Sequence, residues 1–148
     1  MNPTVRRYTN FALLAIVVVL TLATGYIHYW VGGMMLMLNA AGYLALALTV
    51  VGAAAFFRRG LPLVLMALAA YAAVTIVGWL IMGPYFDVAY LAKGIEILLI
   101  GTIAVWLLLN RQETVDSVQW GRSLADRFLR TLLRRPASDE RLTSVDNE

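Results

Sequence analysis

The chain of 148 residues contains no cysteine and a single histidine, His28. The missing thiols exclude disulfide bonds and thiolate metal sites, and one histidine excludes paired-histidine haem ligation and two-histidine zinc sites within the chain. Charge is also scarce, because 14% of the residues are charged, against about 25% in soluble domains. We therefore expect no metal ion and no cofactor.

Apolar residues dominate instead and make up 61% of the chain. Four segments have the length and composition of membrane-spanning helices, which need about 20 apolar residues: 11–30, 34–57, 61–82 and 88–109. Short stretches with glycine or proline separate them, and such residues end helices. The sequence therefore predicts an all-α fold, with residues 1–110 forming a polytopic membrane four-helix bundle in which neighbouring helices are antiparallel.

Basic residues fall almost entirely on one side of this predicted bundle. Arginines precede the first span, separate the second from the third and follow the fourth, and of the twelve basic residues only Lys93 lies elsewhere. Because cytoplasmic segments carry the excess of lysine and arginine, we expect a multi-pass protein of the cell membrane with both termini cytoplasmic. A cleaved signal peptide is the alternative, although the first apolar run continues to an aromatic end at Tyr26, Tyr29 and Trp30, as a retained span would.

The segment 111–135 is polar and keeps helical spacing. Its apolar residues recur at every fourth position: Trp120, Leu124, Phe128, Leu132. This pattern predicts a C-terminal cytoplasmic amphipathic helix that lies on an anionic membrane surface, through Trp120, Arg127, Phe128, Arg130 and Arg134. A helix folded back on the bundle and a helix that docks a partner are the alternatives. Residues 136–148 are polar, and we expect them to be disordered.

Each predicted span has one face that carries its polar side chains. With a rise of about 1.5 Å per residue, His28 lies roughly 3–5 Å inside the outer boundary of its span, and Glu96 about 12 Å inside. Because the helices alternate in direction, the polar groups of all four spans fall in the outer half of the membrane. We therefore predict an outer-half polar cluster made of His28, Asn39, Tyr43, Trp79, Lys93 and Glu96.

Glu96 is the residue of this cluster that is hardest to reconcile with lipid. A charge at the centre of a spanning helix costs about 2.5–3.5 kcal/mol on insertion scales, so Glu96 must be paired, hydrogen-bonded or protonated. Lys93, three residues earlier, is a suitable partner. Intramembrane ionisable groups are candidate ligand or proton-relay sites. The alternative is a structural network that fixes the register of the helices.

Small residues recur along the spans, at Gly42, 52–55, 67–73, Gly94 and Gly101. Residues without bulky side chains let helix backbones approach closely. We expect them to pack the bundle itself, and oligomerisation through one of these faces is the alternative.

Three features make the chain similar to a loose group of small, uncharacterised prokaryotic four-span proteins: His28 late in the first span, "LNAAGY" at 38–43, and Asp87 followed by "AKGIE" at 92–96. The resemblance covers residues 11–110. It implies that the polar positions belong together, and the group has no established activity that could be transferred.

Motifs for enzymatic chemistry are missing from the sequence, which has no nucleophile motif, phosphate-binding loop or paired metal carboxylates. We expect a non-enzymatic accessory or partner-binding subunit with no catalytic residues and with an outer-leaflet polar pocket. The alternative is a small-ligand or proton-coupled carrier that acts as an oligomer. The expected partners are the lipid bilayer and a membrane protein or a second copy of the chain, and no nucleic acid.

Overall fold

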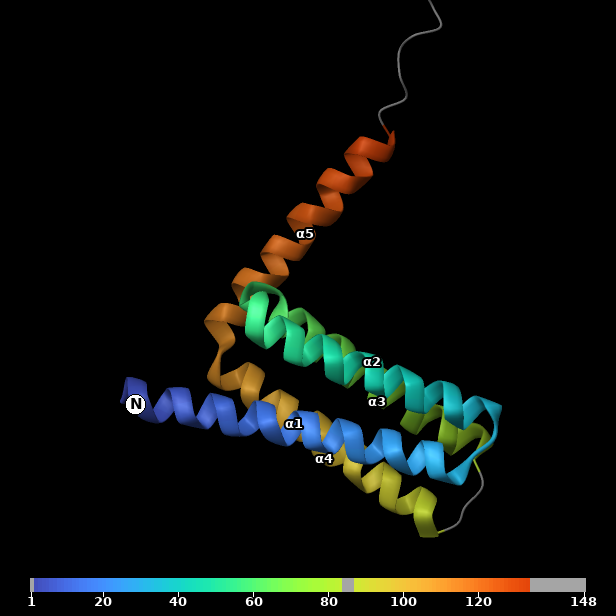
Figure 1. The fold of residues 1–148 in the computed structure, drawn as a ribbon. Coiled ribbons are helices and arrows are strands. Elements are labelled where there is room, and N and C mark those ends of the chain that lie inside the picture. Colours follow the sequence, from blue (N-terminus) through green and yellow to red (C-terminus); the bar gives the residue numbers. More distant parts are fainter. Residues whose placement is uncertain (1, 84–86, 134–148) are drawn as a thin grey trace, which may run out of the picture. The chain divides into compact units, whose positions relative to one another are not determined.

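The computed structural model describes residues 2–83 and 87–133, and these are helical almost throughout (Figure 1). The elements are α1 (Pro3–Val31), α2 (Met34–Phe56), the short 3-10 helix η1 (Arg58–Gly60), α3 (Leu61–Met82), α4 (Asp87–Leu109) and α5 (Arg111–Leu133). The helices α1 to α4 are long and apolar enough to cross a membrane. The predicted fold class is confirmed: four packed candidate spans and a fifth, C-terminal helix. Residues 136–148, which we expect to be disordered, and Arg134 lie outside the described residues.

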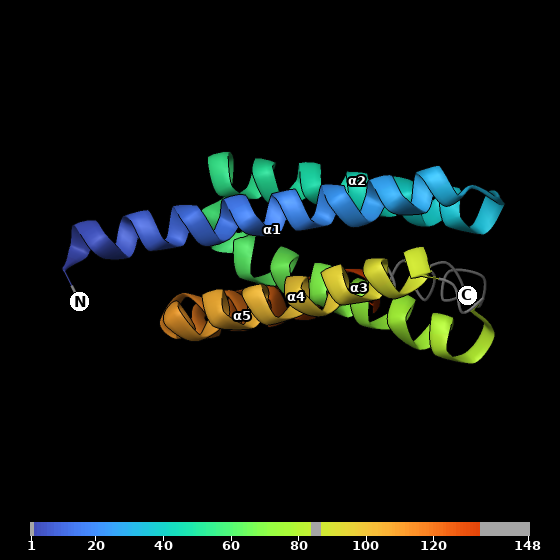
Figure 2. The same ribbon diagram turned by 90° about the horizontal axis from the view of Figure 1, so that it is seen from below.

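The four long helices form a ring in which each packs against its chain neighbours and α4 closes on α1. Figure 2 shows α1 and α2 in one layer and α3 and α4 in the other. This arrangement brings α1 and α4, which are far apart in the sequence, side by side along much of their length.

The ends of α1 follow from local chemistry. Asn2 caps the helix, since its side chain accepts a hydrogen bond from the Thr4 amide at 3.1 Å, and Pro3 occupies the first turn, where a missing N–H costs nothing. The helix therefore begins well before the apolar run at residue 11. It ends at Val31, and the next two residues, Gly32 and Gly33, have φ angles of 77° and 88°, which are favourable for glycine and make the tight turn into α2.

The interior of the bundle is divided into two levels. Toward η1 it is apolar and is filled by side chains such as Val17, Val50, Leu65, Ile103 and Trp106. Toward the α1–α2 turn it is polar, because Thr24, His28, Tyr43, Lys93 and Glu96 are all buried there. Polar groups of several spans therefore lie at one level of the bundle, and the place of this level in the outer half of a membrane stays a prediction.

Glycines serve two different purposes in this bundle. Gly25 packs closely on α2, because a Cβ at this position would lie 3.2 Å from the Cβ of Tyr43. Gly42 makes room for the Tyr71 ring. At Gly52, Gly94 and Gly101, by contrast, an added Cβ would meet no described atom within 4 Å. The expectation that these three glycines pack the bundle internally is therefore wrong within the described residues.

A second compact unit begins at Gln119. The structure describes its residues 119–133, which are the distal part of α5. Its apolar residues are largely exposed, and Phe128 and Leu132 are both 65% accessible. Arg122, Arg127 and Arg130 are exposed as well. This segment is an amphipathic helix, as predicted.

Candidate functional site

Glu96 of α4 is the centre of the polar level and is fully buried. Its Oε2 accepts a hydrogen bond from Lys93 Nζ at 2.7 Å, and its Oε1 accepts one from Thr24 Oγ1 of α1 at 3.2 Å. Lys93 is 7% exposed and also donates to the backbone oxygen of Thr75 in α3, at 3.3 Å. Since both carboxylate oxygens accept and an ammonium group supplies one of the donors, the geometry is that of a buried ion pair.

His28 of α1 also lies close to Glu96. Its Nδ1 lies 2.8 Å from the backbone oxygen of Thr24, which can only accept, so we assign the hydrogen to Nδ1. The other ring nitrogen, Nε2, therefore faces Glu96 Oε1, at 3.7 Å. His28, Lys93 and Glu96 carry no net charge when the imidazole is neutral and one positive charge when it is protonated.

A second arm of the network runs through two tyrosines of α2 and α3. The Tyr43 and Thr75 hydroxyls lie 2.9 Å apart, and the Thr75 hydroxyl also lies 2.8 Å from the Ala72 backbone oxygen. The Tyr43 ring lies 5.6 Å from the His28 ring and meets the Tyr71 ring edge to face at 4.9 Å. The network therefore connects all four spans.

Asn39 lies at the edge of the network. The Tyr71 hydroxyl is 3.3 Å from both its backbone oxygen and its side-chain oxygen. Trp79 packs edge to face on Tyr90 of α4, with ring centroids 5.1 Å apart. The structure thus joins His28, Asn39, Tyr43, Lys93 and Glu96 of the predicted cluster and places Trp79 against a different ring.

Three further residues belong to the network by contact: Thr24, Tyr71 and Thr75. Their positions on the polar faces of their helices are the sequence signal that could have included them. The central residues of the network are shielded from the surface, since they range from fully buried to 7% exposed.

A second polar cluster, which the sequence analysis missed, lies at the arginine-rich end of the bundle. Asn10 and Asn110 exchange reciprocal amide hydrogen bonds of 2.9 and 3.0 Å, and Asn110 is 1% exposed. Asn110 also accepts from Arg6 Nη2 at 3.2 Å and donates to the backbone oxygen of Trp106 at 2.9 Å. These bonds tie α1 to the junction between α4 and α5. The sequence indicates this cluster only by one asparagine directly before the first apolar run and another directly after the last.

Four of the residues predicted to contact the membrane surface lie on α5: Trp120, Arg127, Phe128 and Arg130. Arg127, Phe128 and Arg130 are exposed, and Trp120 is half-buried. Helical spacing puts Trp120 and Phe128 on one apolar face, with Arg127 beside it.

No family model, curated protein or solved structure matches the chain. No family is therefore identified, and the resemblance to small four-span proteins is supported only at the level of architecture. Four long apolar helices packed into one bundle make the chain a small polytopic membrane protein in contact with the lipid bilayer.

Proposed function

We propose that this protein is a non-enzymatic accessory subunit of the cell membrane, which binds another membrane protein, or a second copy of itself, through its outward-facing helix surface. The observation that carries the proposal is the closed network around Glu96, whose oxygens both have donors and whose neighbours are buried. Because the central polar groups satisfy one another, we place recognition on the outer surface. In this proposal the polar cluster fixes the register of the four helices, and no outer-leaflet pocket is needed.

The outer surface of the bundle is extensive, and at two glycines of α4 it carries no side chain. In the most apolar 18-residue stretches of the second and third candidate spans, only 17% of the residues are buried in the bundle. In the corresponding stretch of α4, 33% of the residues are buried. Gly94 and Gly101 lie on one exposed face of α4, two turns apart, with no described atom near their missing side chains. Such a face allows a helix of another chain to approach closely.

Copurification from native membranes tests this proposal. A stable stoichiometric partner, or a dimer, is expected for the wild-type chain and for the control Gly52→Leu, which adds one such side chain on α2 instead of two on α4. The double variant Gly94→Leu/Gly101→Leu is expected to lose it. A wild-type chain that purifies as a monomer without a stoichiometric partner would overturn the proposal, and so would a partner that survives the double substitution.

A second candidate function is a small-ligand or proton-coupled carrier that acts as an oligomer. The observation in its favour is that His28 Nε2 and Glu96 Oε1, both ionisable and on different helices, lie 3.7 Å apart. Proton flux into proteoliposomes that contain a pH-sensitive dye is its test. Flux that His28→Gln abolishes would favour the carrier, whereas no flux above that of empty liposomes would remove it.

We also propose that both termini are cytoplasmic and that residues 119–133 lie on the anionic inner leaflet. The arginine distribution supports the orientation, and the exposed apolar face of α5 with arginines beside it supports the contact. Because the chain lacks cysteine, a spin label at Phe128→Cys in the full-length protein can report depth. We expect the label to become inaccessible to water in bilayers containing phosphatidylglycerol, and to regain access when Arg122, Arg127 and Arg130 are changed to glutamine. Equal access in both proteins would contradict lipid contact.

A further inference from the structure

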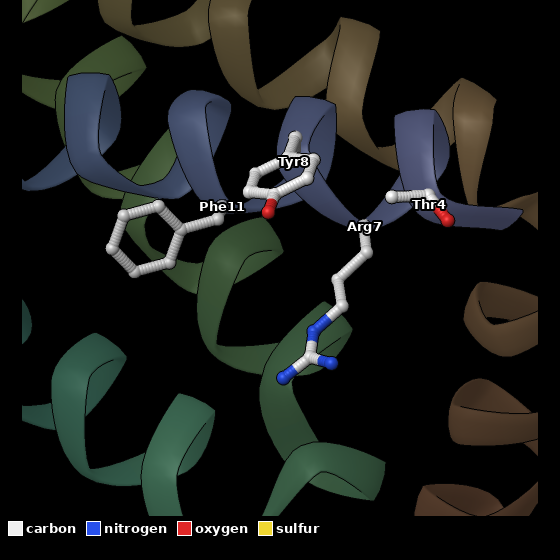
Figure 3. A pocket seen from close by; sticks show the side chains of 4 residues that line it. All are labelled: Thr4, Arg7, Tyr8 and Phe11. Carbon is white, nitrogen blue, oxygen red and sulfur yellow. The ribbon is translucent and has the colours of Figure 1, made fainter.

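Arg6 and Arg7 are adjacent in the sequence but differ in what they contact. Arg6 turns toward the bundle, where its Nη2 donates to Asn110 Oδ1 at 3.2 Å and lies 3.5 Å from Glu113 Oε1. Arg7 makes no hydrogen bond or ion pair within the part of the chain that the structure describes. Its guanidinium extends away from the axis of α1 into an open hollow (Figure 3).

This hollow has a volume of about 580 Å³ and is lined by Thr4, Arg7, Tyr8 and Phe11. The spacing of these residues places them on one face of α1. Tyr8 and Phe11 are 72% and 73% exposed, so two aromatic rings are presented together with a cation that has no hydrogen-bond or ion-pair partner among the described residues. The volume is in the range of about 300–1,000 Å³ that is usual for sites of small molecules.

The level of the hollow along α1 indicates what surrounds it in a membrane. Phe11 opens the apolar run of the first span, and Arg7 lies one turn before it. Phe11 is therefore at the edge of the hydrocarbon region and Arg7 is among the headgroups, where arginine and tyrosine are commonly found. A ligand that fills the hollow must be charged at one end and apolar at the other.

We propose that this hollow binds one anionic phospholipid, with the Arg7 guanidinium on the headgroup phosphate. Guanidinium groups bind phosphate oxygens through two parallel hydrogen bonds, and Arg7 has its donors free because no described residue uses them. Thr4 and Tyr8 add hydroxyl donors on the same face of α1, and Figure 3 shows the Tyr8 hydroxyl turned toward Phe11. Phe11 provides an apolar surface for the first part of an acyl chain. This proposal does not depend on the proposed function.

Two purified variants distinguish this site from a general attraction between arginines and acidic lipids. Arg7→Gln removes the free guanidinium, whereas Arg6→Gln removes the same charge one position away and leaves Arg7 in place. The thermal unfolding midpoint of the full-length protein is measured in neutral detergent with phosphatidylglycerol, with phosphatidylcholine, or with inorganic phosphate. Native mass spectrometry counts the lipids that remain bound.

We expect phosphatidylglycerol to raise the midpoint of the wild-type protein more than phosphatidylcholine does, with one lipid retained. Arg7→Gln is expected to abolish that difference. Arg6→Gln is expected to have a lower unfolding midpoint without lipid, because it loses the contacts of Arg6 with Asn110 and Glu113. It should still respond more to phosphatidylglycerol than to phosphatidylcholine. A protein in which Arg122, Arg127 and Arg130 are glutamine should keep this difference too, because the hollow belongs to α1.

Three results would overturn the proposal. The first is an unchanged response to phosphatidylglycerol in Arg7→Gln. The second is a response that disappears when the arginines of α5 are removed, which would place the lipid on α5. The third is a rise with inorganic phosphate equal to the rise with phosphatidylglycerol, which would make the site one for free phosphate rather than for lipid.

Discussion

Lys93 Nζ lies 2.7 Å from Glu96 Oε2, and both side chains are buried in α4, a helix whose other interior residues are mostly apolar. The pair is held from outside its own helix, because Thr24 of α1 donates to the other carboxylate oxygen and the Thr75 backbone of α3 accepts from the ammonium group. Exposing these two charges of α4 to lipid would be unfavourable. Buried in the bundle, the ion pair instead joins α4 to α1 and α3.

A double-mutant cycle on this pair gives the first prediction. Glu96→Gln leaves the Lys93 ammonium buried without an anion, and removing one partner of a buried pair costs about 3–5 kcal/mol. Lys93→Met should cost a similar amount, whereas the double variant should be less destabilised than either single variant, because it buries no charge. Unfolding in detergent measures all four proteins. Purely additive effects would show that the two residues do not form an ion pair.

The second prediction concerns two glycines of α2. A Cβ at Gly42 would overlap the Tyr71 ring, with Cζ at 2.7 Å, so the ring must move away from Asn39. We expect Gly42→Ala to destabilise the bundle by about 1–3 kcal/mol, as overpacking does. Gly52→Ala is the matched control, because its Cβ meets nothing described and alanine favours the helix by about 0.5–1 kcal/mol. Equal unfolding free energies for the two variants would contradict the packing of Tyr71 against Gly42.

The third prediction concerns the asparagine pair at the other end of the bundle. Asn110→Ala removes the partner of Asn10, a contact of Arg6 and the side-chain bond to Trp106, so it should destabilise the protein more than Asn10→Ala does. We expect about 1–3 kcal/mol for Asn110→Ala, because buried polar partners are left unsatisfied, and about 1 kcal/mol for Asn10→Ala. Hydrogen exchange should rise in the first turns of α1 in both variants. Protection that stays unchanged there would argue against a tie between α1 and the α4–α5 junction.

The fourth prediction concerns orientation. Met34→Cys places a thiol at the exposed start of α2, and Ser123→Cys places one in α5. In intact cells a membrane-impermeant maleimide should label the first and should label the second only after the membrane is permeabilised, because arginine-rich segments are retained inside. The reverse pattern of labelling would contradict the proposed topology.

Much of this architecture could be predicted because its signals are local. The lengths of the apolar runs define the spans, and helical spacing places Thr24 and His28 on one face of α1 and Lys93 and Glu96 on one face of α4. The pairing of Lys93 with Glu96 is also local, since the residues are one turn apart. The alternation of helix direction then brings both faces to one level of the membrane.

The remaining features depend on how the helices are rotated and shifted against one another. The bond between Thr24 and Glu96, and that between Asn10 and Asn110, join residues 72 and 100 positions apart. The sequence wrongly predicted that Gly52, Gly94 and Gly101 pack the interior of the bundle. In a membrane both the lipid-facing and the interior-facing sides of a helix are apolar, so hydrophobic patterning does not show which side a small residue occupies.

Infrared difference spectroscopy of the wild-type protein and Glu96→Gln in lipid bilayers tests the central claim most directly, because it reports the ionisation state of one buried side chain. The ion pair with Lys93, supported by Thr24, predicts that the substitution removes a carboxylate stretching band. Loss of the carbonyl stretching band of a protonated carboxylic acid would instead show that Glu96 is neutral, and would contradict the ion-paired network at the centre of the bundle.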